Sequence, residues 1–294
     1  MSRPDAVDLA CELVRLDTRG GGESAAAALL AGHLEDAGLS VAVHETRPGR
    51  ANVVARHGDE TPVTLTGHLD TVPADEAVWS FDPLAGDVVD GRLRGRGQRV
   101  VLGHKGVLWL VLRATGVPAH GSRPDLGHNA LVDLARAAVR IHEHDGWPTS
   151  PTHGTTTANV GMMRAGVQPN VVPDRAALTV DLRLVPGDTA DAAEATTVGL
   201  AGCPVETERL VELPLIDTDP ARVTQPVELL GGGTPGYATY FTDASVLASA
   251  LGAADTIVFG PGEPEQAHVT DETAPAGLIN PAAEAFRAVL GALT

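Results

Sequence analysis

Hydrophobic and polar positions alternate in two distinct periods along the first 70 residues. Apolar residues spaced as on one face of a helix predict a helix over 5–16, behind Asp5 as a start signal. An alanine-rich stretch that ends at a glycine predicts a second helix over 23–37. Three short β-branched runs, VAVHE, NVVARHG and PVTLTGH, then predict strands separated by turns. Two helices followed by several strands are typical of a layered α/β domain.

The middle of the chain has a clearer pattern. In ALTVDLRLVPG, Leu178, Val180 and Leu182 point to one side of a strand, while Asp181 and Arg183 point to the other. An amphipathic helix is predicted from Asn129 onward because its leucines recur at helical spacing. The other expected elements are strands over 106–116, 155–163 and 205–213 and a helix over about 188–200. These elements predict one sheet with two helices on one face, an α+β module.

The last part of the chain returns to the α/β pattern. Helices are expected over about 243–251 and 281–292, with a strand TIVFG and a Gly/Pro-rich loop between them. The α+β module is therefore predicted to be inserted into a larger α/β domain. We expect residues 1–104 and 213–294 to form the α/β domain and residues 105–212 to form the insert.

Composition and charge exclude several classes of partner. The net charge is −17 with a pI of about 4.9, and no Lys/Arg-rich cluster exists, which argues against nucleic acid and anionic membranes. Cys11 and Cys203 fit no disulfide or CxxC pattern, which favours a reducing cytoplasm. We expect neither a secretory signal nor a membrane span, because the N-terminus lacks an apolar core and no apolar run is long enough.

The segment GHLDTVP is the first candidate for chemistry. His68 and Asp70 follow an expected strand at its carboxyl end, where open α/β sheets bind ligands. A neutral imidazole is a good zinc ligand, and a carboxylate beside it can fix its tautomer. His268, in GPGEPEQAH, also follows an expected strand. Each histidine alone is more often an ordinary loop residue, so the metal hypothesis needs both.

Two further segments carry polar side chains that could bind a ligand. Arg183, on the polar side of its strand, could clamp a carboxylate with two hydrogen bonds, although an ion pair with Asp181 is the more common role of such a residue. His120 and Ser122 lie in PAHGSRP, but no GxSxG motif supports a serine nucleophile. GGGTPG lacks the GK[ST] of a phosphate-binding loop.

Several segments, in this order, resemble the M20 metallopeptidases, a family that includes acetylornithine deacetylase, succinyl-diaminopimelate desuccinylase and glutamate carboxypeptidases. They are GHLDTVP, WSFDPLAGDVVDGRLRGRG, HKGVLWLVLRATGVPAHGSRPDLGHNAL, NVGMMRAGVQPNVVPDRAALTVDLRLVPG, YFTDASVLA and VFGPGEPEQAH. The resemblance implies an α/β domain with a two-zinc site and an inserted lid domain that dimerises. His68 matches the first metal ligand, His268 the last, and Asp70 the carboxylate that supports His68.

The same resemblance implies how a substrate would be held. Arg183 and Asn170 match residues that bind the substrate carboxylate and the lid-side end of the site. His120 matches a lid histidine that reaches toward the partner subunit's active site and steadies the oxyanion. A homodimer is implied, and we expect it to form through the strand 106–116 or the helix 129–144.

The chain departs from the family where the metal bridge should be. The family's GRG is followed by an aspartate that bridges both zinc ions, whereas Gln98, Arg99 and Val100 stand here before the lid begins at HKG. The paired glutamates and a further acidic ligand have no counterpart, and roughly 80 to 90 residues are missing, compared with about 30 in a βαβ unit. The expected fold is therefore a truncated zinc-peptidase-like α/β domain with an inserted α+β lid.

Three interpretations follow. The chain is a hydrolase for an amide bond of an N-acyl amino acid or small peptide, with at most one weakly bound zinc and slow turnover. Alternatively, it is a non-catalytic, dimeric protein that binds a carboxylate ligand, or the product of an internally deleted gene. Four residues could replace the missing ligands in the first case: His57, His104, Asp243 and Glu263.

Overall fold

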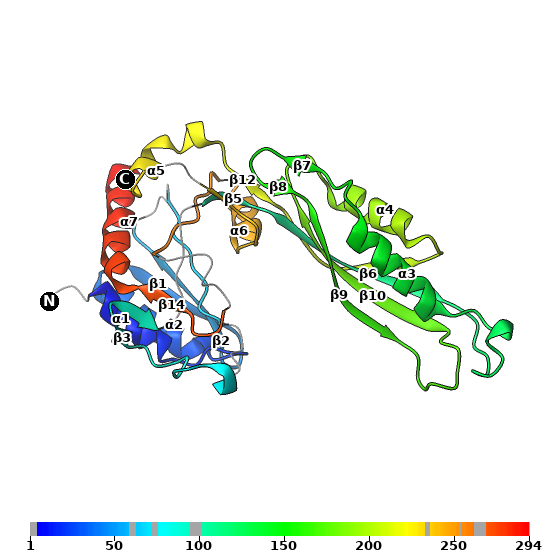
Figure 1. The fold of residues 1–294 in the computed structure, drawn as a ribbon. Helices are drawn as coiled ribbons and strands as arrows, with labels where there is room; N and C mark the ends of the chain where they lie inside the picture. The colour runs from blue at the N-terminus through cyan, green and yellow to red at the C-terminus, as the bar shows by residue number, and fades with distance from the viewer. Residues whose placement is uncertain are drawn as a thin grey trace. The chain divides into compact units, whose positions relative to one another are not determined.

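The computed structural model divides into two compact units (Figure 1). The first unit comprises Met1–Val100, Val223–Pro235 and Val258–Thr294. The second unit comprises Val101–Arg222 and Gly236–Ile257. The structure describes residues 5–58, 63–71, 76–94, 101–232, 236–252, 254–261 and 269–293.

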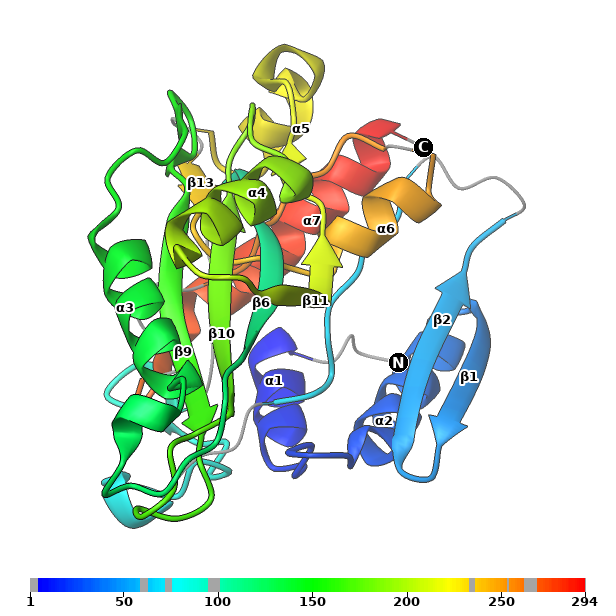
Figure 2. The ribbon, with the colours of Figure 1, turned by 90° about the vertical axis from the view of Figure 1, so that its right-hand side faces the viewer.

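The second unit is built on a four-stranded antiparallel sheet. Its spatial order is β11-β6-β10-β9, with β6 at Gly106–Thr115, β9 at Thr157–Ala165, β10 at Arg175–Leu184 and β11 at Glu206–Leu213 (Figure 2). The expected alternation along β10 is confirmed, because every even-numbered residue from Ala176 to Leu184 is buried.

Two helices cover one face of this sheet (Figure 1). They are α3 at Ala130–Glu143, whose first turn is capped by Asn129, and α4 at Ala190–Ala201, capped by Thr189. Side chains from the covered face and from both helices form one hydrophobic core. Its larger members are Leu108, Leu110, Leu112, Leu134, Ile141, Trp147, Leu178, Val180, Leu182 and Leu184. This core makes the inserted α+β module a folded unit in its own right.

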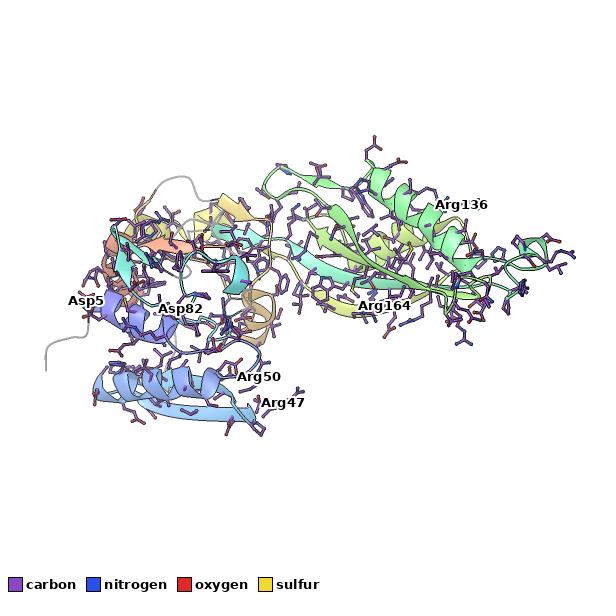
Figure 3. The ribbon with its side chains drawn as sticks, turned by 60° about the horizontal axis from the view of Figure 1, so that its bottom comes forward. Asp5, Arg47, Arg50, Asp82, Arg136 and Arg164 are labelled. Atoms are coloured by element: carbon purple, nitrogen blue, oxygen red, sulfur yellow. The ribbon has the colours of Figure 1, made fainter. Side chains whose placement is uncertain are left out.

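The position of β6 overturns one expectation. β6 pairs with β10 on one side and with β11 on the other, so its backbone has no open edge. The prediction of a dimer that pairs through residues 106–116 is therefore wrong, because a strand with two neighbours cannot take a third. The edges of this sheet are β9 and β11. Arg164 on β9 and Arg136 on α3 both carry exposed side chains (Figure 3).

A small mixed sheet completes the second unit. Its order is β12-β5-β13, with β5 at Val101–His104, β12 at Ile216–Asp217 and β13 at Gly236–Ala238. Helix α6, Ala244–Ala250, contributes Ala244 and Ala248 to a small apolar cluster with Ile216. A two-stranded hairpin, β7 at Thr149–Ser150 and β8 at Gly154–Thr155, lies between α3 and β9 in the chain.

The first unit has smaller pieces of sheet. Helix α2, Glu23–Asp36, packs on the antiparallel pair of β1, Ser40–Arg47, and β2, Arg50–Arg56. Arg47 and Arg50 lie at the β1–β2 turn (Figure 3). A second sheet has the order β14-β4-β3. Its strands, and the remaining helices of this unit, are β3 at Val88–Val89, β4 at Arg92–Arg94, β14 at Thr273–Pro275, α1 at Ala6–Val14, α5 at Thr224–Leu229 and α7 at Ile279–Leu293.

Two expected strands are not formed. The described part of PVTLTGH, residues 63–68, belongs to no strand, and Leu65 is 51% exposed. TIVFG contains only a single bridge residue, Val258. β-branched residues favour an extended backbone, but a strand forms only where a neighbouring strand supplies hydrogen bonds. Apart from the bridge at Val258, no neighbouring strand runs along either segment in the described part of the chain.

Candidate functional site

His68 and Asp70 lie close together in the first unit. The Nδ1 atom of His68 is 2.8 Å from the backbone oxygen of Asp70 and 3.5 Å from its carboxylate Oδ1. Because a carbonyl oxygen only accepts hydrogen bonds, Nδ1 carries the proton and the lone pair is left on Nε2. The ring is thus held in a tautomer that suits a metal ligand, mainly by the backbone of Asp70. Both side chains are at least half exposed.

A zinc site requires more donors than this pair supplies. Among the described residues, no group of three or more His, Cys, Asp or Glu side chains could hold a metal ion. His268, the other expected ligand, and Gln98, Arg99 and Val100 lie outside the described residues. Because zinc sites use at least three protein ligands, the described residues do not fit a complete zinc site, and we derive no reaction step through a metal.

The possible replacement donors do not assemble in the described structure. His104 is fully buried on β5, where its Nδ1 donates to the Lys105 carbonyl at 2.9 Å. Burial lowers the pKa of His104, so its ring is neutral at pH 7. Asp243 precedes helix α6, His57 is exposed after β2, and Glu263 lies outside the described residues.

His120 and Asn170 meet at one end of the second unit. The backbone N–H of Gly121 donates to the Asn170 carbonyl at 2.7 Å, and His120 forms a β-bridge with Val171. The Nδ1 atom of His120 accepts from the backbone N–H of Ser122 at 3.2 Å, so a neutral ring carries its proton on Nε2. Nε2 is therefore available as a donor toward an oxygen anion. Both His120 and Asn170 are exposed.

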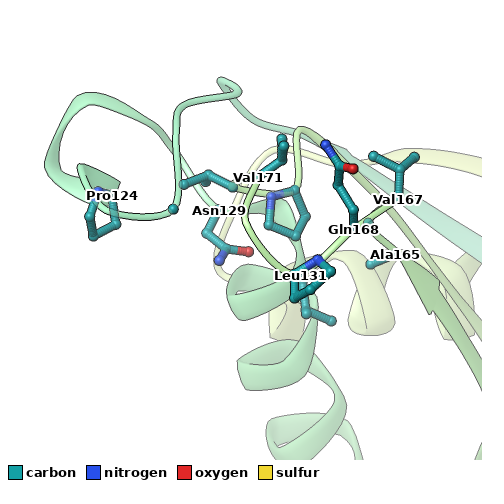
Figure 4. A pocket seen from close by; sticks show the side chains of 12 residues that line it. Pro124, Asn129, Leu131, Ala165, Val167, Gln168 and Val171 are labelled. Carbon is teal, nitrogen blue, oxygen red and sulfur yellow. The ribbon is translucent and has the colours of Figure 1, made fainter.

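An open hollow of about 550 Å³ lies in the same loops (Figure 4). Its wall combines the turn at Ala165–Pro169 with Pro124, Asn129 and Val171. Neither His120 nor Asn170 lines it. Val167 in that turn is almost fully exposed.

Arg183 is positioned near the opposite end of β10. Its Nε and Nη2 atoms donate to the two carboxylate oxygens of Asp181, both at 2.8 Å, and its guanidinium lies 5.1 Å from the ring centre of Phe241. The ion pair that the sequence allowed is therefore formed. Of the three guanidinium nitrogens of Arg183, Nη1 alone makes no hydrogen bond within the described part of the chain.

β10 separates Arg183 from Asn170. Asn170 precedes the strand, which begins at Arg175, and Arg183 is its penultimate residue. A strand advances about 3.4 Å per residue, so the eight steps from Arg175 to Arg183 alone span about 27 Å. A single chain cannot place Asn170 and Arg183 on one small ligand through this sheet.

The chain is similar to M20 proteins in sequence. Residues 102–202 match the family described as "Peptidase dimerisation domain" (M20_dimer). Acetylornithine deacetylase of Vibrio campbellii is 27% identical over 338 residues, covering 86% of this chain and 87% of that protein. This alignment is longer than the whole chain of 294 residues, so the relative contains residues that have no counterpart here. A probable carboxypeptidase of Aspergillus terreus is 43% identical over 95 residues, which are 30% of this chain and only 22% of that protein.

Solved structures show the same fold. An M20 family metallo-carboxypeptidase from Sulfolobus solfataricus aligns with a TM-score of 0.72 at 15% identity, covering 98% of both chains. A tripeptidase from Staphylococcus aureus has a TM-score of 0.72 at 18% identity, covering 99% of both chains. The chain thus shares a mixed α/β fold with solved M20 peptidases, its residues 102–202 match a peptidase dimerisation domain, and its sequence is similar to those of proteins named acetylornithine deacetylase and probable carboxypeptidase.

Sequence reasoning missed one residue of interest. Lys105, in the HKG motif, is buried at the junction between β5 and β6, although lysine is normally exposed. The sequence contained a signal for it, because Lys105 is the only lysine in the chain.

Proposed function

We propose that this chain is a homologue of the M20 amide hydrolases that binds the carboxylate of an N-acyl amino acid or small peptide, with hydrolysis slow or lost. The observation that carries the proposal is the contrast between the two units. The second unit keeps a closed hydrophobic core and carries Arg183 on the face of its sheet that α3 and α4 do not cover. Among its described residues, the first unit supplies His68 and Asp70 as a pair, with no third His, Cys, Asp or Glu beside them to complete a metal site.

Chemistry explains why turnover should suffer. Two zinc ions a few ångström apart repel each other and need a bridging anion, which the sequence lacks after GRG. A positioned general base contributes about 10²–10⁴ in rate, and no glutamate stands in its place. If zinc is the cofactor, His68 and His268 would hold at most one weakly bound ion per chain.

A homodimer is part of the proposal. Charged side chains disfavour the pairing of another strand with the edge strand β11, where Arg209 forms ion pairs with Asp191, Glu194 and Glu212. The other edge, β9, carries the half-exposed Met162, so we propose that two copies meet at β9, with helix α3 beside it. Pairing of two copies would also allow His120 and Asn170 of one chain to reach a ligand held by its partner.

The substrate class follows only from the relatives. Acetylornithine deacetylase and carboxypeptidases are names of similar proteins, so an acylated amino acid or a short peptide is the class to test first. Within the described residues, no helix is long and apolar enough to cross a membrane. A cytoplasmic location remains a prediction from cysteine usage.

The test combines metal analysis with binding and activity. Protein dialysed against metal-free buffer and then against equimolar zinc should retain at most one zinc per chain. It should bind N-acetyl and N-succinyl amino acids in calorimetry, and cleave them far more slowly than the median enzyme rate of about 10 s⁻¹. Two tightly held zinc ions with turnover near that rate would refute the loss of hydrolysis, and the absence of any binding would refute the carboxylate site.

A further inference from the structure

Lys105 is an unusual residue in this protein. It is the only lysine among 294 residues, because the other 20 strongly basic side chains are all arginine. It is also buried, with 4% of its surface exposed. A buried ammonium group is costly unless charge or hydrogen bonds compensate for it.

The described surroundings of Lys105 compensate its positive charge only in part. Its Nζ atom donates to the backbone carbonyl of Thr155 at 2.5 Å, and its backbone N–H donates to the Ala238 carbonyl at 3.2 Å. Within the part of the chain that the structure describes, Lys105 has no carboxylate partner. An ammonium group has three hydrogens to donate, and one carbonyl supplies no negative charge.

Arg183 lies on the same face of the sheet. In the β6–β10 register Arg183 is opposite Val107, and Lys105 precedes Val107 by two residues, so both basic side chains belong to the face that α3 and α4 leave uncovered. Trp109 on this face is 38% exposed. Burial, and secondarily the charge of Arg183, lowers the pKa of Lys105. The like charge of Arg183 thus adds to the cost of charging Lys105.

The two cations differ in how they are neutralised. Asp181 already occupies Nε and Nη2 of Arg183 with both of its carboxylate oxygens. Lys105 has no such partner in the described structure. We propose that Lys105 is the main cation that receives an acidic group of the ligand, and that Arg183 assists through its remaining Nη1 hydrogens.

This inference rests on the proposed function and refines it. It assigns the carboxylate of an N-acyl amino acid or small peptide to a lysine–arginine pair in which the lysine supplies the uncompensated charge. The competing explanation is structural: Lys105 would only fasten the β8 strand through Thr155. The replacement of Lys105 by glutamine separates the two, because glutamine can donate to the Thr155 carbonyl but carries no charge.

The single lysine gives a direct measurement. Protein grown with lysine labelled with ¹³C at Cε contains one labelled side chain, so one NMR signal reports on Lys105. Titration with N-acetyl-L-alanine should move this signal, whereas the neutral N-acetyl-L-alanine amide should leave it in place. Calorimetry should show that Lys105→Gln weakens the binding of N-acetyl-L-alanine at least about tenfold, while Lys105→Arg keeps most of the affinity.

The outcomes distinguish this inference from the proposed function. Binding by Lys105→Gln within twofold of the parent protein, together with an unmoved NMR signal, would overturn the role of Lys105 and leave the carboxylate site to Arg183. A signal that moves with acetate or phosphate but with no N-acyl amino acid would support the anion site and refute the proposed substrate class. Circular dichroism checks that each variant is folded. If Lys105→Gln does not fold, the titration of the parent protein decides.

Discussion

The hydrophobic core of the second unit allows a quantitative test of the two-unit architecture. Leu178 is fully buried in the middle of β10, on the face covered by α3 and α4. Truncation of a buried leucine to alanine removes its transfer free energy and leaves a cavity, which together cost about 2–5 kcal/mol. With a urea m-value of about 2 kcal/mol/M, Leu178→Ala should lower the midpoint of unfolding of this unit by about 1–2.5 M.

Tryptophan fluorescence can follow this transition. Trp147 is buried in the core of the second unit, and Trp109 lies on β6, whereas Trp79 belongs to the first unit. A Trp79→Phe background therefore confines the signal to the second unit. The matched control is Leu210→Ala on β11 of the same unit, because Leu210 is 51% exposed and its truncation should change the free energy of unfolding by no more than about 0.5 kcal/mol.

The comparison of the two leucines decides the outcome. If Leu178→Ala moves the midpoint no further than Leu210→Ala does, the β10 core is not closely packed, and the second unit cannot serve as a rigid platform for Arg183. A large shift for Leu210→Ala would instead show that this side chain is packed in solution, which contradicts its exposure in the structure.

Three further predictions concern assembly, binding and pH. Met162→Lys on β9 should convert the proposed dimer into a monomer in light scattering at micromolar concentration, whereas Val132→Lys on the exposed side of α3 would do so only if the helix were the main contact. Arg183→Met should weaken binding of N-acyl amino acids about tenfold to a hundredfold in calorimetry, and unchanged affinity would remove Arg183 from the site. Hydrogen bonds from Thr207 and Arg209 lower the pKa of Glu194, so ionised Glu194 stabilises the fold above its unfolded pKa of about 4.3, and this stabilisation is lost as pH falls through the folded pKa. Glu194→Gln should therefore lower the melting temperature at pH 7 but leave it unchanged in strong acid. Thermal scans of both proteins at the two pH values would check this.

Local patterns were sufficient for the elements that have their partners nearby in the chain. The strict alternation from Ala176 to Leu184 predicted both a strand and its buried face, because side chains of a strand point to opposite sides in turn. Asn129 and the leucines after it predicted helix α3 and its start. The pairing of His68 with Asp70 also followed from two residues of spacing.

Long-range neighbours decided the rest. The apolar run of β6 was compatible with an edge or a central strand, and only the register with β10 and β11 made it central. The run at 63–67 had the composition of a strand but lacks a strand beside it among the described residues. Likewise, the motifs suggested that Arg183 and Asn170 bind one substrate together, whereas the length of β10 places them far apart in a single chain.

The sequence by itself determined the M20 resemblance, the helices and strands of the α+β module, and the fact that Gln98, Arg99 and Val100 rather than an acidic residue follow GRG. The tertiary structure alone decided that Lys105 is buried without a carboxylate partner in the described chain, and that Arg183 is already paired with Asp181. Hydrophobic periodicity reports on the side of an element that meets the core, and motifs report on the kinds of side chain present. The compensation of a charge depends on atoms brought together by folding, such as Thr155, 50 residues from Lys105 in the chain.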